Sequence, residues 1–515
     1  MCVWFISSDS ELHQRRFSTD NIRIPTSIPF EVHPLIISGS AENRVDLVFF
    51  ADGYVEAERQ KFLDDSLRLA EDISGNQTFY TVKPLMNFWA AFAPSNESGI
   101  GSGGKPKDTV LGLYRDGTEL RAVYYSKPEV VKAMCSQLGA QCDYPILLGN
   151  DPYYGGLGGE FTVITASLAN GPLVLRHELG HSIIEVGEEY DGGFAYFGAN
   201  AANDLSAPLP WAHWLSDPHA DPRSPRVERS VMPMQAYPWT MLNTTTAWSV
   251  QFTSSGSYPR HLVRFSLSGI PEATDLKIEL DGRVLRWTPK PGIGLDRWHY
   301  DIHQNFSLTG GVHELKFTLL NGGREGTAQL CSAELLEFGD ESEFHSNAGY
   351  YGIFPTFSDK NTTSYRPTNE DCLMRIVTTP NFCKACLEAL WLSLLRRVNF
   401  IDDIKETCAQ RIYGGGRESQ HVSVKTLAVQ FVPLADFRQD ALELRQKESY
   451  TILWYRNNQI LDNSSNKTVL EISNDQIPGN FTISVKFASE EIRVDKEGLL
   501  ERKRTYEVTK RCDED

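Results

Sequence analysis

The segment His177-Glu178-Leu179-Gly180-His181 holds the side chains best suited to chemistry. The two histidines are four residues apart, so on a helix they lie about 40° apart around the axis and ~6 Å along it, close enough to bind one ion. Two neutral imidazoles suit Zn2+, and an open coordination position holds a water whose pKa falls to about 7. Glu178 would take the proton of that water and pass it to the leaving amine. Apolar residues on both sides predict a buried helix, not a solvent-facing one with two unrelated histidines.

A third protein ligand is needed to complete such a site. A straight helix would carry residues beyond Ile184 too far along its axis to reach the same ion. We expect Gly187 to end the helix in a left-handed conformation, so that the chain turns back towards the metal. Glu188 is the predicted third ligand and Glu189 the second choice. The alternatives lie further along the chain, at His213, Asp217, His219 and Asp221.

Alternating strands and helices are expected to position this segment, which predicts an α+β, α/β-like catalytic domain. The glycine-rich stretch 155–159 is interpreted either as a flexible loop or as a rim where the backbone lies close to an extended peptide substrate. The predicted strands cover residues 45–50, 87–92, 146–148 and 161–165, and the predicted helices cover residues 55–73, 128–138 and 173–186.

The rest of the chain is predicted mainly as β-structure. A length of 515 residues indicates two to four domains. Short β runs predict an inserted β-sandwich at residues 246–344 and a C-terminal immunoglobulin-like β-sandwich at residues 401–515. The catalytic domain is then expected in two parts, residues 28–245 and 345–400, after an N-terminal extension of residues 1–27.

Composition and charge limit the partners that we expect. The 50 basic and 67 acidic side chains give a net charge of −17, which disfavours nucleic acid and anionic membrane surfaces. No apolar run reaches the ~18 residues of a transmembrane segment, and the first six residues are not typical of a signal peptide. The Asn-x-Ser/Thr acceptors nevertheless favour a secreted, extracellular glycoprotein. These acceptors are Asn76, Asn96, Asn243, Asn305, Asn361, Asn463, Asn466 and Asn480.

The nine cysteines predict disulfide bonds, with at least one thiol left over unless a bridge joins two chains. Cys135 and Cys142 could close a short loop. Cys383 and Cys386 form a C-x-x-C pair, but no second pair of cysteines or histidines follows at the spacing of a zinc finger. Disulfides or buried thiols are therefore expected there in preference to a metal site.

The pattern around the zinc motif resembles the IgA peptidase family of zinc metallopeptidases, named for a bacterial enzyme that cleaves immunoglobulin A. The resemblance spans roughly residues 30–245 and 345–400 and leaves out the two predicted β-sandwiches. Besides the zinc motif it rests on Asp52-Gly53-Tyr54, Asn87-Phe88-Trp89, Pro94-Ser95-Asn96-Glu97-Ser98-Gly99, Tyr154-Gly155-Gly156, Tyr365-Arg366-Pro367 and Cys372-Leu373-Met374.

The resemblance implies a zincin fold with metzincin-like features and endopeptidase activity on protein or peptide substrates. It implies that His177 and His181 bind zinc and that Glu178 is the catalytic acid and base. Met374 is expected to form a methionine turn beneath the metal. Immunoglobulin as the substrate does not transfer, because specificity belongs to the cleft and to accessory domains that differ here.

The residues after the zinc motif depart slightly from the family pattern. Glu188-Glu189-Tyr190 stands where the family usually has Asp-Glu-Tyr, so Glu188 takes the place of the aspartate ligand. The substrate cleft is expected at Tyr154, Gly155, Gly156 and Tyr190.

Three functions follow as hypotheses. The first is a zinc-dependent metalloendopeptidase. The alternative is a non-catalytic protein- or glycan-binding module on a peptidase scaffold, against which the intact Glu178 argues. A third hypothesis keeps the zinc but has it hydrolyse a non-peptide bond, because an activated water is not selective by itself.

Overall fold

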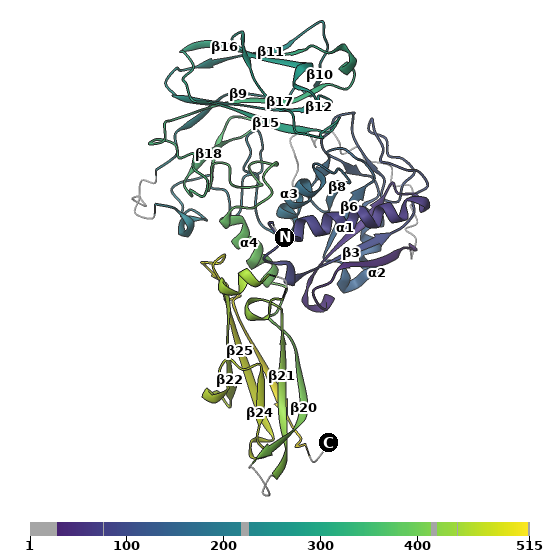
Figure 1. Cartoon of the computed structure of the whole chain (residues 1–515), viewed down its shortest axis with the longest axis vertical. Coiled ribbons are helices and arrows are strands. Elements are labelled where there is room, and N and C mark those ends of the chain that lie inside the picture. The colour runs from purple at the N-terminus through teal and green to yellow at the C-terminus, as the bar shows by residue number, and fades with distance from the viewer. Residues whose placement is uncertain (1–27, 76, 218–225, 414–419, 440, 513–515) are drawn as a thin grey trace. The chain divides into compact units, whose positions relative to one another are not determined.

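The computed structural model describes residues 28–75, 77–217, 226–413, 420–439 and 441–512 (Figure 1). The chain divides into two compact units. The larger unit runs up to Ile36 and continues in Asp46–Tyr80 and Phe88–Ala389. The smaller unit comprises Ile37–Val45, Thr81–Asn87 and the chain from Leu390 onward.

A mixed sheet of six strands forms the centre of the first part of the chain. Its middle strands β2, β6 and β8 run parallel, and the last strand, β7, is antiparallel to β8. Every residue of β2 is buried, as expected for a parallel strand that is covered on both faces. In sheet order the strands are β1 (Glu31–Ile36), β3 (Met86–Phe92), β2 (Val45–Asp52), β6 (Tyr144–Gly149), β8 (Thr162–Thr165) and β7 (Gly156–Leu157).

Three helices cover this sheet. Helix α2 (Pro128–Leu138) packs Val131 and Met134 onto the face that carries Phe50. On the opposite face, α1 (Arg59–Gly75) places Phe62 against Phe92, with ring centroids 5.8 Å apart. Helix α3 (Gly171–Ile183) lies beside α1, and its backbone at Gly171 approaches Leu69. Nine of the thirteen residues of α3 are buried, including the polar residues Arg176 and His177, so the helix is largely buried, as its apolar flanks predict.

A β-sandwich follows within the larger unit, and its two sheets pack face to face through Phe265 and Phe317, whose ring centroids lie 5.6 Å apart. The first two strands, β9 and β10, come before residue 246, where we expected the sandwich to begin. One sheet contains β9 (Ser230–Ala236), β10 (Thr240–Met241), β12 (Arg260–Ser268), β15 (Trp298–Gln304) and β17 (Gln329–Phe338). The other contains β11 (Trp248–Ser254), β13 (Leu276–Leu280), β14 (Arg283–Leu285) and β16 (Gly311–Leu319).

Shorter elements complete the larger unit. Two hairpins pair β4 (Leu113–Tyr114) with β5 (Tyr124–Tyr125) and β18 (Phe354–Phe357) with β19 (Thr363–Arg366). Helix α4 (Lys384–Leu395) follows them, and from Leu390 its residues belong to the smaller unit. The predicted short loop between Cys135 and Cys142 is confirmed, because these residues form a disulfide.

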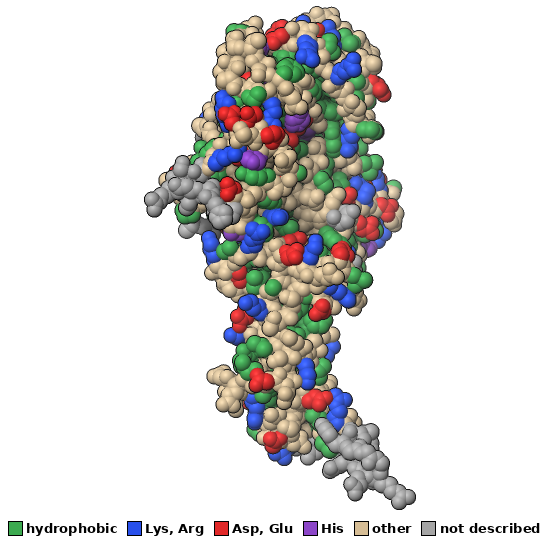
Figure 2. All heavy atoms as spheres, turned by 60° about the vertical axis from the view of Figure 1, so that its left-hand side comes forward, with side chains coloured by type: hydrophobic (Ala, Val, Ile, Leu, Met, Phe, Trp, Pro, Cys, Tyr) green, Lys and Arg blue, Asp and Glu red, His purple; other side chains and the backbone are tan. Residues whose placement is uncertain are grey.

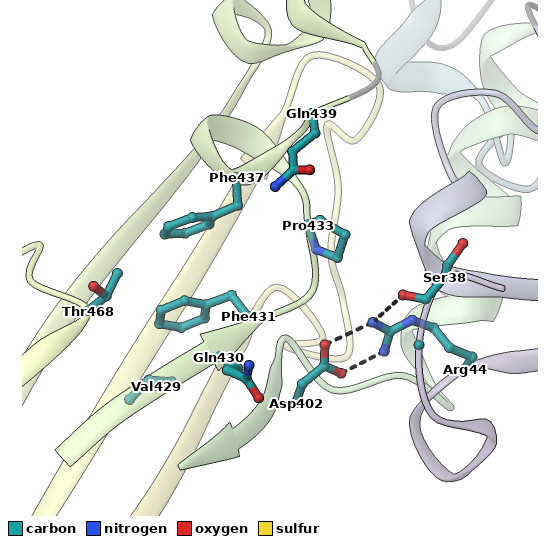
Figure 3. Close-up of a pocket in the computed structure, with 11 residues that line it drawn as sticks. Ser38, Arg44, Asp402, Val429, Gln430, Phe431, Pro433, Phe437, Gln439 and Thr468 are labelled. Atoms are coloured by element: carbon teal, nitrogen blue, oxygen red, sulfur yellow. Dashed lines mark hydrogen bonds and ion pairs between the residues drawn. The ribbon is translucent and has the colours of Figure 1, made fainter. Parts of the chain in front are cut away.

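The smaller unit is built from two antiparallel sheets, and a second disulfide joins Cys408 to Cys512. A surface pocket of this unit contains Arg44, whose guanidinium binds both carboxylate oxygens of Asp402 at 2.6 and 2.8 Å (Figure 3). No residue of the predicted active site lines this pocket. The sheets contain β20 (Ile401–Tyr413), β21 (Gln420–Phe431) and β24 (Val469–Ile472), and β22 (Glu448–Arg456), β23 (Gln459–Ile460), β25 (Gly479–Ser489) and β26 (Glu501–Val508).

The fold is therefore mixed α/β. It has few helices, and most of its strands lie in several sheets that are compatible with β-sandwich domains. The zincin class of the catalytic part stays a prediction. Among the described residues, none of the helices has the length and apolar character needed to cross a membrane. On the face drawn in Figure 2, acidic and basic side chains are interspersed.

Candidate metal centre

Helix α3 presents its two histidines to the same point. The Nε2 atoms of His177 and His181 lie 3.3 Å apart, and the ring centroids lie 4.9 Å apart. Both residues follow the buried, apolar first turns of α3, so the helix that holds them is fixed by packing. The predicted pairing of the two imidazoles on one helix face is what the structure contains.

The chain turns back after α3, but by a different route from the one we expected. The helix ends at Ile183, and Ile184 is already extended, with φ −115° and ψ 151°. Gly187 is not left-handed, so that prediction was wrong. The reversal comes from a short antiparallel pairing, in which Gly187 N–H donates to Phe197 O at 2.9 Å and Glu188 N–H donates to Ala195 O at 2.8 Å. Glycine is required at 187 for space, since a Cβ there would lie 2.3 Å from Ala195 O.

This pairing brings Glu188 to the two histidines. Its Oε1 lies 3.1 Å from His181 Nε2, and its Oε2 lies 3.2 Å from His177 Nε2. Ligand atoms of the three side chains all lie within 4.8 Å of one another. The structure thus brings together the three residues that we predicted as metal ligands.

The donor atoms fit a metal ion. His181 Nδ1 lies 3.1 Å from Val186 O, and because a carbonyl oxygen can only accept, Nδ1 donates a hydrogen bond to it. In a neutral imidazole, Nε2 then presents a lone pair towards Glu188 Oε1, which is also an acceptor. A cation between Nε2 and Oε1 would accept both lone pairs and so remove the repulsion between these two acceptors. Two imidazole nitrogens and a carboxylate are ligands typical of catalytic Zn2+ sites.

The electrostatics of these side chains favour a positive charge between them. Burial by itself lowers the pKa of His181, but the Glu188 carboxylate outweighs it and raises that pKa to about 9. Burial by itself raises the pKa of Glu188, but the imidazoles of His181 and His177 hold it well below its usual range. A proton or a metal ion can supply this charge.

Glu178 lies against the glycine-rich rim. A Cβ at Gly158 would come within 2.6 Å of Glu178 Oε2, and a Cβ at Gly156 would come within 3.3 Å of Oε1. Burial raises the pKa of Glu178, and the nearby His177 and His181 imidazoles offset part of that increase. The carboxyl group therefore sits between the rim and the two histidines.

The rim itself is the strand β7, the last in its sheet. β7 pairs with β8 on one side, and no other strand of the described residues pairs with its second edge. Gly155, just before β7, is held where a Cβ would lie 2.6 Å from Val123 Cγ2. Part of this stretch is thus the edge of a sheet, and its contact with an extended peptide substrate stays a prediction.

Two tyrosines lie close to the candidate ligands. The Tyr190 ring centroid lies 6.2 Å from that of His177, and burial together with the Glu188 carboxylate raises the pKa of Tyr190 well above its usual value. Burial also raises the pKa of Tyr154, which is close enough to Glu178 and Glu188 to feel their charge. Both predicted cleft tyrosines therefore surround the three-residue group.

Side chains of the inserted sandwich also reach this region, although no feature of the sequence indicated it. Asp296 accepts a hydrogen bond from Tyr154 N–H at 2.5 Å and another from Asn170 Nδ2, at the start of α3, at 2.9 Å. The Arg297 guanidinium lies over the Tyr154 ring, 4.8 Å from its centroid. No motif marks these residues, because their role depends on how the sandwich packs.

Met374 lies beneath the helix of the two histidines. It is fully buried, and its Sδ lies 3.1 Å from the position that a Cβ of Gly180 would occupy. Its carbonyl oxygen accepts a hydrogen bond from Glu189 N–H at 2.9 Å. This is the place expected for a methionine turn.

The other candidate ligands lie elsewhere. Glu189 is buried and points away from the histidines, with Asn200 Nδ2 donating to its Oε1 at 2.9 Å. His213 contacts Glu388 instead. Asp217 belongs to none of the ligand groups found among the described residues, and His219 and Asp221 lie outside those residues. Asn200, which also binds Gly187, is a further residue that no sequence signal indicated.

Comparisons with known proteins extend this description. A comparison with curated proteins finds no match. Among solved structures, one match is a Paenibacillus sp. cycloisomaltooligosaccharide glucanotransferase in complex with cycloisomaltoheptaose, at 12% identity and a TM-score of 0.15. It covers 74% of this chain, and the chain spans about half (53%) of that protein's length. A likeness this weak carries no argument about fold or function.

The family model described as IgA Peptidase M64 matches residues 34–223. The matched segment contains the zinc motif, Glu188 and the strands and helices that position them. The match indicates a metallopeptidase, and it agrees with the convergence of His177, His181 and Glu188. The resemblance seen in the sequence is thereby confirmed, because residues 34–223 match the model of the IgA peptidase M64 family.

Proposed function

We propose that the protein is a zinc-dependent metalloendopeptidase. The observation that carries this proposal is the convergence of His177, His181 and Glu188 beside the carboxyl group of Glu178. A bound zinc ion would supply an activated water and polarise the carbonyl group of the scissile peptide bond.

The side chains around the ion have distinct roles in this proposal. Glu178 accepts the proton of the attacking water and passes it to the leaving amine, which suits a carboxyl group whose pKa is raised by burial. Glu188 holds the ion together with the two histidines. Tyr190, beside His177, is placed to donate a hydrogen bond to the oxygen on which charge develops.

The edge of β7 supports a peptide as the substrate. An extended peptide adds to an exposed sheet edge through backbone hydrogen bonds. Gly156 and Gly158 let such a peptide approach Glu178, because neither residue places a side chain between the backbone and that carboxyl group. Binding through the backbone does not require a chain end, which favours an endopeptidase.

Replacing Glu178 with Gln tests the proposal. Gln keeps the shape of the side chain but cannot take up the proton, so E178Q should lower kcat/KM on a protein-derived peptide library by about 10²–10⁴-fold. Its zinc content should equal that of the wild type, because no ligand is removed. E185Q, at an exposed glutamate of the same segment, is the matched control and should keep full activity. Activity of E178Q at the wild-type level would refute the assignment.

Metal removal is the second arm of this test. A chelator should abolish hydrolysis, and added Zn2+ should restore it, whereas the H181A variant should stay inactive after zinc is added. Hydrolysis that continues in the fully chelated wild-type protein would contradict a zinc mechanism.

We also propose that the protein is extracellular. Six of the predicted glycosylation acceptors are exposed, as glycosylation requires. Expression in a secretory eukaryotic cell should yield protein whose mass falls after enzymatic removal of N-glycans, and an unchanged mass would count against the proposal. The exposed acceptors are Asn96, Asn305, Asn361, Asn463, Asn466 and Asn480.

A further inference from the structure

Three cysteines and a glutamate gather behind the candidate catalytic group. Cys372, Cys383, Cys386 and Glu189 are all buried, and one potential ligand atom from each lies within 4.8 Å of the others. Nothing in the proposed peptidase mechanism uses these side chains. The sequence argued against a metal at Cys383 and Cys386 because no second pair follows them, but the fold supplies two more ligands from earlier segments.

Two of the distances between the ligand atoms are those of a tetrahedral site. Cys372 Sγ and Cys386 Sγ lie 3.7 Å apart, and Cys386 Sγ lies 3.7 Å from Glu189 Oε1. A disulfide would require about 2.05 Å between the sulfurs. Ligands of a tetrahedral zinc ion, with bonds of roughly 2.0–2.3 Å, lie roughly 3.5–3.8 Å apart. The spacing therefore suits ligands that share one ion.

The surroundings also prepare these atoms to bind a cation. Cys383 N–H donates to Cys372 Sγ at 3.4 Å, and Cys383 itself directly precedes helix α4, whose N-terminus favours negative charge. Asn200 Nδ2 donates to Glu189 Oε1 at 2.9 Å. Glu189 Oε2 is buried and receives no hydrogen bond from any N–H or O–H group of the described residues. A cation bound by the Glu189 carboxylate would compensate this unsatisfied buried oxygen.

We propose that Cys372, Cys383, Cys386 and Glu189 bind a second zinc ion, which is structural. Four protein ligands close the coordination sphere and leave no position for water or substrate, as is typical of structural zinc sites. The ion links the segment after the third catalytic ligand to the start of α4. It also links both to the turn of Met374, two residues after Cys372.

This second site would stabilise the residues that support the candidate catalytic group, namely Glu189 and Met374. Glu189 follows Glu188 directly, and its N–H donates to Met374 O. Met374 in turn lies beneath Gly180 of α3. An ion that fixes Glu189 and Cys372 therefore restrains both the third catalytic ligand and the support of the histidine helix.

Metal analysis with matched variants tests the proposal. Protein purified under reducing conditions should contain two zinc ions per chain. The H177A/H181A double variant should keep one ion, and C383S should lose one. C331S, which removes a buried thiol outside the cluster, should keep two. Retention of both ions by C383S would overturn the proposal.

Cobalt substitution gives a readout that does not depend on a variant folding. Co2+ bound by thiolates absorbs in the near ultraviolet by charge transfer, and the catalytic group contains no sulfur ligand. Wild-type protein and H177A/H181A should both show this band. Its absence from the wild type, or a Cys372–Cys386 disulfide found by non-reducing peptide mapping, would overturn the second site and leave the peptidase proposal untouched.

Discussion

The contact between Gly158 and Glu178 shows how a single residue can control this site. Gly158 lies well before α3 in the sequence. Its backbone nevertheless lies where an added Cβ would be 2.6 Å from Glu178 Oε2 and 3.5 Å from His181 Cδ2. The Glu178 carboxyl group can occupy its position only because residue 158 has no side chain. Gly158 has no positive φ, so space is the reason for the glycine there.

The G158A variant should therefore affect the reaction more than the fold. The added methyl group displaces the end of the flexible Glu178 side chain, and a displacement of about 1 Å can lower the rate about 10²-fold. We expect kcat to fall by about 10- to 100-fold while zinc content and melting temperature stay near the wild-type values. G75A, at a helical glycine with no atom within 4 Å of the added Cβ, is the control. An unchanged kcat in G158A would show that Glu178 tolerates the methyl group.

At the residue scale, spacing alone was enough to predict that His177 and His181 lie together on one helix face. Four residues make nearly one turn of any helix, so that geometry is local. The choice of Glu188 over Glu189 agrees with their positions, but the reason was different from the one predicted. Gly187 acts by admitting Ala195 O, and such a close approach to a later segment leaves no trace in the local sequence.

At the scale of elements, the position of Glu188 depends on a short antiparallel pairing that the Asn200 side chain stabilises. The Asn200 side chain accepts from Gly187 N–H at 3.0 Å and donates to Gly187 O and Glu189 Oε1, each at 2.9 Å. These bonds hold Gly187 and Glu189, the residues on either side of Glu188, in place. Since Asn200 is fully buried, bulk water does not compete for these bonds in the folded protein.

Replacing Asn200 with Ala should weaken zinc binding as well as stability. Loss of the buried bonds leaves polar groups unsatisfied, at a cost of about 3 kcal/mol in the free energy of unfolding. Loss of support for a ligand typically lowers metal affinity by about 10- to 100-fold. Competition with a chelator measures the affinity, and chemical denaturation measures the stability.

The N203A variant is the control for that experiment. Asn203 is exposed and binds Tyr196 O and Ser364, not the segment that carries Glu188. It should keep the wild-type affinity for zinc. Equal zinc affinities of N200A and the wild type would show that Asn200 does not position Glu188.

The elements themselves were predictable where their periodicity is strong. The helix at residues 128–138 has the predicted bounds, and the strand predicted at residues 87–92 begins one residue earlier, at Met86. The strands β9 and β10 were not recognised as part of the sandwich, because they join it only by pairing with β17, which is distant in sequence. For the same reason the thiol of Cys386 and the carboxyl group of Glu189, 197 residues apart, could not be matched in advance.

At the scale of the whole molecule, acidic side chains outnumber basic ones, and some of the acidic side chains are buried. Glu334 on β17 is 6% exposed and accepts a hydrogen bond from the Tyr237 hydroxyl at 3.1 Å. Burial, with the repulsion of Asp191, raises the pKa of Glu334 to about 7 from an ordinary value of 4.5. Between these two pH values the folded protein holds a proton that the unfolded chain has released.

The free energy of unfolding should consequently fall as pH rises from about 5 to 8. The folded state binds more protons than the unfolded state in this window, so the slope is negative, and Glu334 contributes about 3 kcal/mol to the decline. E334Q keeps an oxygen for the Tyr237 hydroxyl but cannot ionise, so its stability relative to the wild type should improve by about that amount between pH 5 and pH 8. Denaturant unfolding at both pH values measures the difference, with E272Q, at an exposed glutamate of the same sandwich, as the control. Parallel pH profiles for E334Q and the wild type would mean that Glu334 ionises as easily in the folded protein as in the unfolded chain.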